Sequence, residues 1–365
     1  MRNRLELAVN ALHHFQIDGM LRGCSPYGNG HINDTFCAIT EDENGQVRRY
    51  ILQALNQNVF KQPDKVMENI AGVIAHLHTK TDDPRAVMSL VPTVSGEVYY
   101  KDQEGVFWRL YDFVEQSLCL ERPESNDDFY QSALAFGRFQ RDLSDFPAEK
   151  LNETIVNFHN TPVRYENFLA AVKADKMGRA KDVQAEIQFI MDRADFYPVL
   201  MDAQKNGTLP LRVSHNDTKI NNVLLDEATR SALCVIDLDT IMPGFSVTDF
   251  GDSIRFGAST AAEDEKDLDK VWMDIALFET YAKGFLAGCG GSLPKEEVML
   301  LPEGAKMMTI ECGMRFLADY LEGDTYFRIH YPTQNLDRCR TQLKLVADME
   351  SKWEQMKAIV AAYCE

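Results

Sequence analysis

The stretch Val213–Leu225, Val-Ser-His-Asn-Asp-Thr-Lys-Ile-Asn-Asn-Val-Leu-Leu, places polar residues between two short apolar segments. Its polar members include His215, Asp217, Lys219 and Asn222. A single Asp or Asn beside a strand is most often a turn former, because both residues suit turns and caps. A histidine, an aspartate, a lysine and an asparagine in one short loop are less easily explained as turn formers. Their grouping predicts a loop with catalytic or binding side chains, held in place by the flanking apolar segments.

The spacing within this loop is that of a phosphoryl-transfer site. Phosphoryl transfer from ATP needs a carboxylate that orients a hydroxyl, oxygen ligands for Mg²⁺ and a cation near the travelling charge. Protein kinases arrange the first two as His-Arg-Asp-x-x-x-x-Asn, and Asp217 and Asn222 keep that spacing. Lys219 follows the Asp closely and supplies the cation. We therefore predict Asp217 and Lys219 as catalytic residues, with His215 in structural support.

Three aspartates beyond the loop compete for the metal. Asp237 ends a second apolar segment, Ala232–Ile236, which predicts a hairpin that returns its carboxylate to the loop bearing Asn222. Asp237 and Asn222 are therefore the predicted Mg²⁺ ligands, completed by the ATP phosphates. Asp239 is either an outer ligand or a solvated residue. Asp249 begins an Asp-Phe-Gly string like the metal-binding tripeptide of protein kinases, but it lies farther along, where a helix is expected, and is predicted to support the loop backbone.

A glycine turn near the N-terminus predicts a loop over the ATP phosphates. Gly28 and Gly30 allow the backbone to approach a ligand closely, although a plain hairpin turn would explain them about as well. The turn is followed by a strand and then by Arg49–Gln53. Protein kinases carry a phosphate-binding lysine on that third strand, whereas this chain has Gln53. Either the Gln53 amide contacts phosphate, or Lys219 and Mg²⁺ supply the positive charge.

The order of strand-like and helix-like segments predicts an α+β, two-lobed protein-kinase-like fold. A small antiparallel-sheet N-lobe is expected over residues 1–114 and a larger, mostly helical C-lobe over residues 115–365. In such folds the linker backbone binds adenine, so Asp112, Phe113 and Val114 are predicted at the nucleotide. Further N-lobe strands are expected at Val87–Val91, Val98–Lys101 and Val106–Val114. Apolar periodicity predicts helices at Leu5–Phe15, Pro63–Lys80, Phe129–Leu143, Tyr165–Lys173, Ala180–Tyr197, Lys266–Ala287 and Leu336–Tyr363.

Composition restricts the partners. The chain has 365 residues, 45% of them hydrophobic and 26% charged, as in an ordinary globular protein of about two domains or lobes. Its net charge of −18 disfavours nucleic acid and anionic membranes as partners. The eight cysteines are scattered and form no Cys-x-x-Cys pair, and no apolar run is long enough to span a membrane. These features predict a cytoplasmic enzyme with a small-molecule substrate.

The motifs resemble a known family. His215–Asn222 followed by Ile236–Asp239 is similar to the aminoglycoside phosphotransferase/choline kinase superfamily, whose members are small-molecule kinases with the two-lobed fold. Further segments resemble one group within it, the N-acetylhexosamine 1-kinases, which also share Gln53. This resemblance implies transfer of the ATP γ-phosphate to the anomeric hydroxyl of N-acetylglucosamine or N-acetylgalactosamine, giving the α-1-phosphate used in sugar salvage. The segments that carry it are Tyr27–Asn33, Tyr50–Gln53, Ile236–Gly244, Asp249–Thr260 and Glu311–Gly323.

The sugar-binding residues follow partly from the chain and partly from the resemblance. Arg315 and Asp319 have the spacing of neighbours on one helix face, and Tyr326 follows shortly after. From spacing alone a structural ion pair between the two is favoured. The resemblance instead favours sugar binding by Arg315, Asp319 and Tyr326. His31 and Asn33, next to the glycine turn, are further predicted contacts to the sugar or its acetamido group.

Two other functions remain open. The chain could be a choline, homoserine or aminoglycoside kinase of the same superfamily, and its net negative charge would suit a cationic aminoglycoside. Arg315 in the predicted pocket would repel a polycation, which favours a neutral sugar. A non-catalytic nucleotide-binding protein is the other alternative, and the complete set of Asp217, Lys219, Asn222 and Asp237 argues against it.

Overall fold

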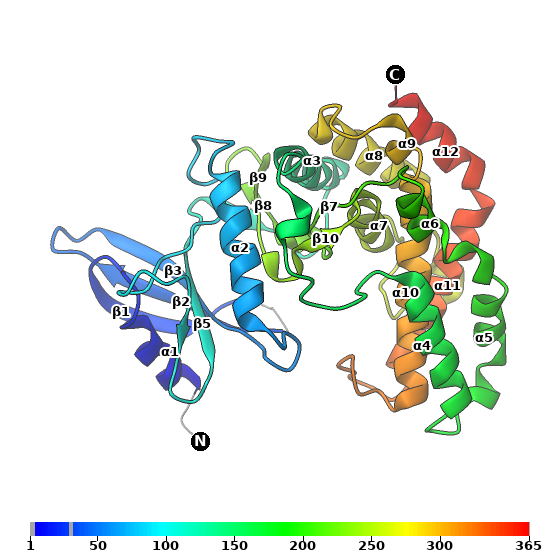
Figure 1. The fold of residues 1–365 in the computed structure, drawn as a ribbon, viewed down its shortest axis with the longest axis horizontal. Coiled ribbons are helices and arrows are strands. Elements are labelled where there is room, and N and C mark those ends of the chain that lie inside the picture. The colour runs from blue at the N-terminus through cyan, green and yellow to red at the C-terminus, as the bar shows by residue number, and fades with distance from the viewer. Residues whose placement is uncertain (1–3, 29–31, 365) are drawn as a thin grey trace.

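A five-stranded antiparallel sheet forms the first part of the molecule (Figure 1). The computed structural model describes residues 4–28 and 32–364. The strand order is β1-β2-β3-β5-β4, and the register places Gln53 on β3 beside Arg109 on β5 and Thr35 on β2. The strands are β1 (Met20–Pro26), β2 (Asp34–Glu41), β3 (Val47–Ala54), β4 (Tyr100–Lys101) and β5 (Phe107–Asp112).

Two helices cover the two faces of this sheet. α1 (Arg4–Leu12) buries its apolar face in a cluster that includes Leu52 and Trp108. α2 (Pro63–Leu77) begins with a proline in its first turn, where no backbone donor is lost, and packs against the other face near Tyr111. The α2 cluster continues into Leu238 and other residues of the second lobe. One hydrophobic core therefore joins the sheet to the region of the predicted metal site.

The second lobe is mainly helical and lies beside α2 in Figure 1. α10 runs through it and packs on α4, α7 and α11, while α3 packs on α8. Contact between α7 and α10 is close because Gly304 has no side chain; a Cβ atom there would lie 2.0 Å from the Val247 carbonyl oxygen. The helices are α3 (Asn126–Asp142), α4 (Thr161–Ala174), α5 (Gln184–Met191), α6 (Val199–Lys205), α7 (Ser246–Gly257), α8 (Ile275–Cys289), α9 (Lys295–Val298), α10 (Leu301–Glu322), α11 (Gln334–Ser351) and α12 (Trp353–Ala362).

Short strands and 3₁₀ turns lie between the helical part and the N-lobe. β6 (Ser117–Cys119), β8 (Val223–Asp226) and β9 (Ala232–Val235) form one small sheet, and β7 (Arg212–Ser214) pairs with β10 (Met242–Gly244). The predicted catalytic loop connects β7 to β8, and the turn η5 (Leu238–Thr240) follows β9. The 3₁₀ turn η4 (Ile220–Asn222) ends the catalytic loop.

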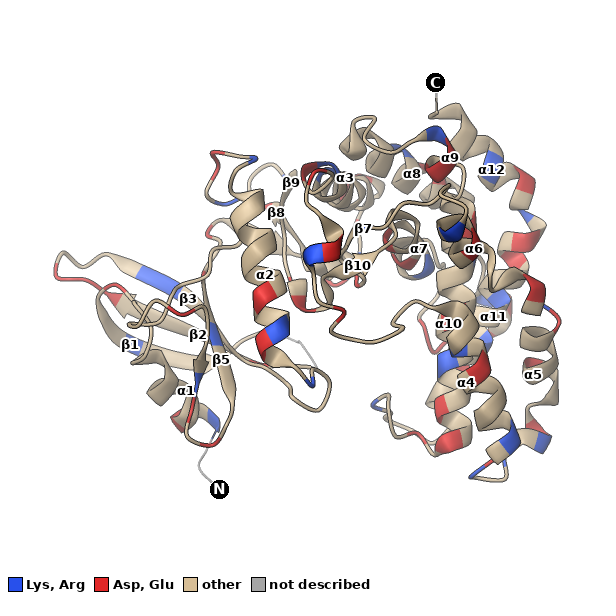
Figure 2. Ribbon diagram, in the orientation of Figure 1, with Lys and Arg blue, Asp and Glu red and all other residues tan. Residues whose placement is uncertain are grey.

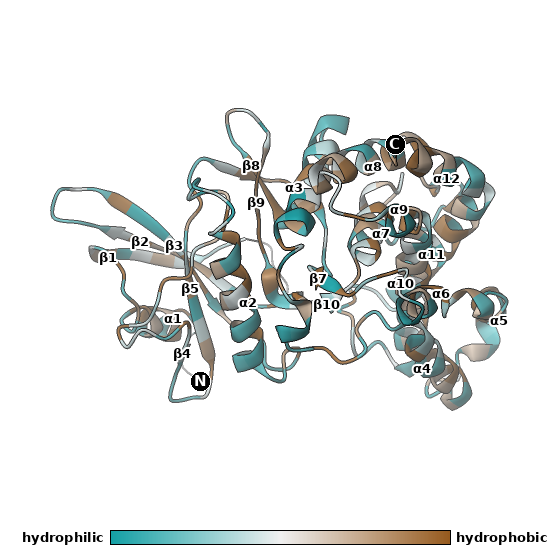
Figure 3. Ribbon diagram, turned by 45° about the horizontal axis from the view of Figure 1, so that its top comes forward, coloured by the Kyte–Doolittle hydropathy of each residue, from teal (hydrophilic) through white to brown (hydrophobic). Residues whose placement is uncertain are grey.

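Charged residues of both signs are distributed along the helices of both lobes (Figure 2), and outer helices such as α4 and α12 alternate hydrophilic with hydrophobic segments (Figure 3). Of the helices in residues 4–28 and 32–364, none is both long and apolar enough to cross a membrane. The predicted α+β class, with a small antiparallel sheet and a mostly helical remainder, is confirmed.

Several expected boundaries were wrong. The helix predicted over Lys266–Ala287 begins only at Ile275, because the Asp274 side chain caps it by accepting hydrogen bonds from the backbone of Ala276 and Leu277. It ends at Cys289, because the following Gly290 adopts a left-handed conformation with φ of +56°.

Other predicted elements are divided. Ala180–Tyr197 holds α5 between two 3₁₀ turns, and Leu336–Tyr363 is two helices separated at Lys352. The expected strand Val87–Val91 contributes an isolated bridge through Leu90. Apolar periodicity continued through these breaks because buried residues occur on both sides of each.

Candidate active site

The carboxylate of Asp249, on α7, holds the backbone of the predicted catalytic loop. Its two carboxylate oxygens accept hydrogen bonds from the backbone N–H groups of His215 (2.9 Å) and Asn216 (2.8 Å). Gln140 of α3 donates to the same carboxylate at 2.8 Å. Burial raises the pKa of Asp249, and these hydrogen bonds offset part of the rise. Asp249 therefore joins α3 and α7 to the loop and is fully occupied by that contact.

His215 also lies inside the structure. Its side chain is buried, packs edge-on against the rings of Phe136 and Phe139, and its Nε2 atom is 2.9 Å from the Ile236 carbonyl oxygen. Ile236 immediately precedes Asp237, so this contact connects the catalytic loop to the segment that carries the predicted metal ligand.

The loop brings Asp217, Lys219 and Asn222 together. Lys219 Nζ is 2.8 Å from Asp217 Oδ1, and Asn222 Nδ2 donates to the Asp217 backbone oxygen (2.8 Å) and carboxylate (3.2 Å). Burial alone would lower the pKa of Lys219, but the Asp217 charge outweighs it and the pKa is raised. Lys219 is therefore a permanent cation beside Asp217. Because the Asn222 amide nitrogen is engaged, its oxygen is the atom available to a metal ion.

Asp237 is the exposed carboxylate next to this group. It adopts a left-handed backbone conformation with φ of +59°, and its side chain is open to solvent. Its pKa is raised, first by the surrounding protein and then by the carboxylates of Asp239 and Asp217, although solvent screens part of this effect. A divalent cation would offset the repulsion among these carboxylates, so the residues fit a metal ion.

That metal ion would need ligands from outside the protein. Within residues 4–28 and 32–364, no three His, Cys, Asp or Glu side chains are grouped to hold one. Asp237 and the Asn222 oxygen would supply two ligands, and Mg²⁺ in nucleotide sites takes the others from phosphate and water. The arrangement would suit a metal ion that is bound together with a nucleotide.

Gln53 is hydrogen-bonded within the sheet, and a buried cation, Arg109, lies on the neighbouring strand β5. The Gln53 amide oxygen accepts hydrogen bonds from Arg109 Nε (2.9 Å) and Nη2 (2.8 Å), and the Gln53 amide nitrogen donates to Thr35 Oγ1 (3.1 Å). Arg109 is only 1% exposed and forms an ion pair with Asp239. The sequence analysis did not predict a role for Arg109. Its importance follows from its position opposite Gln53 in the register of β3 and β5.

Two residues near Gln53 are engaged within the protein. Asp239 is 5% exposed and pairs with Arg109, so it is not solvated. Asn33 donates through Nδ2 to Asp239 and accepts from the Asn56 backbone N–H at 3.0 Å. One donor and one acceptor of the Asn33 side chain are therefore used inside the protein, and its second N–H group leaves the sugar contact a prediction. Its predicted neighbours Gly30 and His31 lie outside the described residues.

The glycine turn lies beside the linker between the lobes. Gly28 has a φ of +74°, which favours glycine, and the preceding Tyr27 packs edge-on against Phe113 at 5.8 Å between ring centroids. In the linker, Asp112 donates its backbone N–H to Ser89 and Phe113 donates its own to Arg49, at 3.0 and 3.1 Å.

These sheet hydrogen bonds change the expectation for adenine binding. The N–H groups of Asp112 and Phe113 are already used, so a nucleotide base would have to take its donor from Val114 or beyond. The Val114 carbonyl accepts a hydrogen bond from the Ser117 hydroxyl at 2.6 Å, which fixes the direction of the linker as it enters the second lobe.

The predicted sugar-binding residues lie on α10 and the loop after it. Arg315 has its guanidinium carbon 5.7, 5.6 and 5.4 Å from the ring centroids of Phe158, Tyr326 and Phe327, and it donates to the Tyr326 hydroxyl at 3.4 Å. Tyr326 is 65% exposed. Arg315 and Tyr326 therefore form a cationic and aromatic surface open to a ligand.

Asp319 has a different task from the one expected. Its carboxylate accepts hydrogen bonds from three successive backbone N–H groups, those of Thr325, Tyr326 and Phe327, and from Asn335 Nδ2. It is 4% exposed. The expected direct sugar contact does not agree with this geometry; Asp319 instead folds the loop that returns Tyr326 to Arg315.

A group of buried charges connects Arg315 to the catalytic loop, and the sequence reasoning did not single it out. Asp252 of α7 accepts hydrogen bonds from the Thr218 backbone N–H and from Arg255 Nε, both at 3.1 Å. Burial alone would raise the pKa of Asp252, but nearby Arg255, Lys219 and His159 outweigh it and the pKa is lowered. One indication of this group was present in the sequence, because Asp252 follows Asp249 by three residues on α7.

The second half of this group lies on α10. Glu311, one turn before Arg315, accepts from Thr161 Oγ1 at 2.6 Å and lies 2.8 Å from His159 Nδ1. Burial alone would raise the pKa of Glu311, but His159, Thr161 and Arg315 outweigh it and the pKa is lowered. Glu311 is therefore an ionised carboxylate beneath the Arg315 surface.

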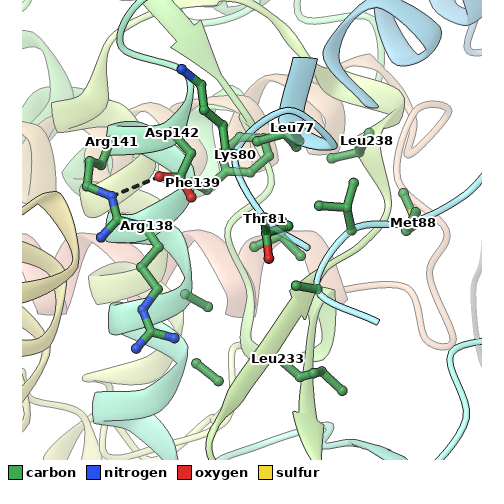
Figure 4. Close-up of a pocket in the computed structure, with 15 residues that line it drawn as sticks. Leu77, Lys80, Thr81, Met88, Arg138, Phe139, Arg141, Asp142, Leu233 and Leu238 are labelled. Atoms are coloured by element: carbon green, nitrogen blue, oxygen red, sulfur yellow. Dashed lines mark hydrogen bonds and ion pairs between the residues drawn. The ribbon is translucent and has the colours of Figure 1, made fainter. Parts of the chain in front are cut away.

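A separate cavity of about 400 Å³ lies among α2, α3 and β9 (Figure 4). Its wall is apolar at Leu77, Phe139 and Leu233, and Arg138 and Lys80 project from its sides. Leu238, the residue after Asp237, also lines it. The cavity thus contacts the metal-site turn, but the residues predicted for catalysis do not line it.

Comparison with known proteins identifies the class. Residues 23–278 match the model of the phosphotransferase enzyme family, so the chain belongs to this family. The fold is similar to that of a microcompartment-associated aminopropanol kinase, with a TM-score of 0.64 and 17% identity over 96% of this chain and 98% of the other. An aminoglycoside phosphotransferase from Alicyclobacillus acidocaldarius has a TM-score of 0.62 and 13% identity, covering 96% of both chains. Choline kinase from Cryptosporidium parvum has a TM-score of 0.55 and 11% identity, covering 94% of this chain and 93% of the other.

Proposed function

We propose that the protein is a cytoplasmic, ATP-dependent anomeric kinase that phosphorylates N-acetylglucosamine and N-acetylgalactosamine at the C1 hydroxyl to give the α-1-phosphate. Membership of a phosphotransferase family supports the reaction type. The sugar specificity rests on the Arg315 surface and on the resemblance of the motifs to N-acetylhexosamine 1-kinases.

The catalytic steps follow from the loop. Asp217 orients the C1 hydroxyl and accepts its proton as the hydroxyl oxygen attacks the γ-phosphorus of ATP; the bond to the bridging β–γ oxygen breaks and ADP leaves. Lys219, held 2.8 Å from Asp217, places positive charge near the transferring group. Asp237 and the Asn222 oxygen would hold Mg²⁺, which supplies charge neutralisation at the phosphates when bound. Positioning contributes most of the rate, because the transition state is loose.

The observation that carries the proposed acceptor class is the positive charge of the surface around Arg315. Arg164 donates two hydrogen bonds to the Phe158 carbonyl, and its pKa is lowered first by burial and then by the charge of Arg315. The guanidinium carbons of Arg164 and Arg315 lie 5.9 and 5.7 Å from the centroid of the Phe158 ring, so two positive charges lie near each other beside the exposed Tyr326. A cationic acceptor would add a third positive charge there, whereas a neutral sugar would not.

This charge supports a neutral acceptor over the cationic acceptors that the names of the similar structures suggest. Aminopropanol, choline and aminoglycosides are all cations at neutral pH, and an aromatic cage or a cluster of free carboxylates would suit them. Here the nearest buried carboxylates, Asp252 and Glu311, are already paired with Arg255 and His159. A neutral acceptor with several hydroxyl groups fits this surface better.

The test is release of ADP from Mg-ATP with N-acetylglucosamine, N-acetylgalactosamine, galactose, choline, homoserine and kanamycin, followed by NMR of the product. Turnover of both N-acetyl sugars with phosphate on C1 is the expected result. Turnover of choline or kanamycin in their place would overturn the acceptor assignment. Nucleotide binding without turnover of any acceptor would favour a non-catalytic role.

A further inference from the structure

Thr218 separates the two predicted catalytic residues, and three residues of α7 hold it in place. Thr218 is buried, its backbone N–H donates to the Asp252 carboxylate at 3.1 Å, and its hydroxyl donates to the Asp249 backbone oxygen at 2.5 Å. Its own backbone oxygen accepts a hydrogen bond from the Ser253 hydroxyl at 2.5 Å. The backbone between the two predicted catalytic side chains is therefore attached to α7 at three points.

α8 supports one of these attachments. The hydroxyl of Tyr281, on α8, donates to Ser253 Oγ at 2.5 Å. The direction of this bond follows from its neighbour: the Thr218 carbonyl can only accept, so Ser253 uses its one hydrogen there and Tyr281 is the donor to Ser253. Burial raises the pKa of Tyr281, so the phenol keeps the proton that it donates.

The ring of Tyr281 is fixed by its packing. Tyr281 is 0% exposed, and its ring centroid lies 4.8, 5.5 and 6.3 Å from those of Phe129, Phe250 and Phe285. Ser253 is buried as well. Because both side chains are enclosed by protein, this hydroxyl pair (Tyr281 and Ser253) can influence a reaction only through the loop backbone.

The peptide groups on the two sides of Thr218 are held by different side chains. The peptide group before Thr218 is bound at both polar atoms, since Asn222 donates to its oxygen at 2.8 Å and Asp252 accepts from its nitrogen. The peptide group after Thr218 is bound at its oxygen by Ser253, and it leads directly into Lys219. The hydroxyl pair therefore acts on the backbone that carries Lys219.

We infer that Tyr281 and Ser253 are positioning residues for phosphoryl transfer. Their hydroxyl groups fix the backbone that leads into Lys219, and so keep its ammonium group 2.8 Å from the Asp217 carboxylate. A misplacement of about 1 Å in a catalytic group can lower a rate by about a hundredfold. The inference rests on the proposed function only in assigning Lys219 to phosphoryl transfer, and it holds for any acceptor.

Small substitutions separate this role from general packing. Tyr281→Phe removes one oxygen and keeps the aromatic packing, while Ser253→Ala removes the donor to the Thr218 carbonyl. Tyr197→Phe is the matched control, because Tyr197 is also buried and donates its hydroxyl to a backbone oxygen, that of Ile190 on α5, at 2.5 Å.

Steady-state kinetics with Mg-ATP and N-acetylglucosamine test the effect on the reaction. We expect Ser253→Ala to lower kcat at least about tenfold and Tyr281→Phe at least about threefold, with both KM values changed by less than about twofold. Tyr197→Phe should keep the wild-type kcat, although its Tm should fall as far as that of Tyr281→Phe.

Two double variants test the route of the effect. Tyr281→Phe combined with Ser253→Ala should have the kcat of Ser253→Ala alone, because Tyr281 acts through Ser253. In a Lys219→Met protein, Ser253→Ala should lower kcat by less than about twofold, because the ammonium group that it would misplace is already absent. A general loss of packing would lower kcat by the same factor in both backgrounds.

Hydrogen exchange followed by mass spectrometry gives a measurement that needs no turnover. The backbone amides of residues 215–222 should exchange faster in Tyr281→Phe and Ser253→Ala than in the wild type, because the loop has lost an attachment to α7. The same amides should exchange at the wild-type rate in Tyr197→Phe.

The outcomes distinguish the inference from the proposed function. A wild-type kcat for Ser253→Ala, or an equal loss of kcat in the Lys219→Met background, would overturn the inference. If an acceptor other than the N-acetyl sugars is phosphorylated, the proposed sugar fails, and the same comparison with that acceptor decides the role of the hydroxyl pair. If no acceptor is phosphorylated, the proposed function fails; unchanged loop exchange would then overturn the inference too, whereas faster exchange would uphold the positioning of the loop.

Discussion

Arg109 on β5 forms an ion pair with Asp239, so a buried cation of the N-lobe sheet is joined to the turn that carries Asp237. The two side chains are 1% and 6% exposed, and the guanidinium also donates twice to Gln53. Burial alone would lower the pKa of Arg109, but Asp239 outweighs it and the pKa is raised. A lysine–glutamate pair links strand and helix in protein kinases. In this chain the buried cation is Arg109, which lies on β5 beside β3. It pairs with Asp239, in the turn that follows the predicted metal ligand Asp237.

Removal of one member of this pair should be strongly destabilising. Arg109→Met leaves Asp239 buried without its cation, and we expect the free energy of unfolding to fall by about 3–5 kcal/mol. Arg109→Met combined with Asp239→Asn should lose less than the sum of the two single changes. Denaturant unfolding of the four proteins in a double-mutant cycle measures the coupling. Additive losses would show that the two residues act independently.

Restoring the lysine of protein kinases should be harmful. Gln53→Lys replaces the amide oxygen that accepts from Arg109 with a second cation at the same place, so it adds repulsion and leaves two donors unpaired. We expect a lower Tm and weaker ATP binding. Gln53→Glu is the matched comparison, because it keeps an acceptor for Arg109 and should retain more stability. A Gln53→Lys protein with normal stability and tighter ATP binding would contradict this account.

The grouping of the predicted catalytic residues could be read from the sequence because most of them lie in one short segment. The spacing of Asp217 to Asn222 and the apolar segment before Asp237 predicted that these residues meet, and the structure places them together. The sheet and the helical lobe were also predictable, since each long amphipathic element buries one face.

What the sequence could not provide were pairings between distant segments. Arg109 and Asp239 lie far apart in the chain, as do His159 and Glu311, and each pair becomes visible only when strand register and helix packing are known. Asp319 shows a related limit. Spacing placed it on the same helix face as Arg315, but only the following loop shows that its carboxylate is used by backbone N–H groups.

Asp237 and Asp249 should respond differently to removal. Asp237→Ala deletes an exposed carboxylate that repels Asp239 and Asp217, so stability should be unchanged or slightly higher while Mg²⁺-dependent turnover is lost. Asp249→Ala leaves three buried donors without an acceptor and should lower the free energy of unfolding by at least about 2 kcal/mol. Thermal unfolding and metal titration of both variants give the comparison. A stable Asp249→Ala protein that has lost metal binding would reverse the two roles.

Arg315→Ala should change the acceptor site and spare the nucleotide site. We expect the KM for N-acetylglucosamine to rise at least about tenfold with little change in the ATP KM, and cationic acceptors to be rejected less strongly than by the wild type. Arg193→Ala is the control, since Arg193 also stacks on an aromatic ring, that of Phe189 at 3.4 Å, in another part of the lobe. An equal rise in both KM values would indicate general distortion.

Asp217→Asn tests the chemical step itself. The amide retains the size of the carboxylate and the Asn222 bond to the Asp217 backbone, so ATP and sugar binding should persist. It cannot accept the hydroxyl proton, and it removes the negative charge that holds Lys219, so kcat should fall by about 10²–10⁴-fold. Asp202→Asn is the matched control, because Asp202 pairs with Lys205 at 3.1 Å on α6, where both side chains are exposed. If kcat of Asp217→Asn equals that of the control, another carboxylate must accept the proton and position Lys219. Asp252, which accepts a hydrogen bond from the Thr218 backbone, would then be the next residue to substitute.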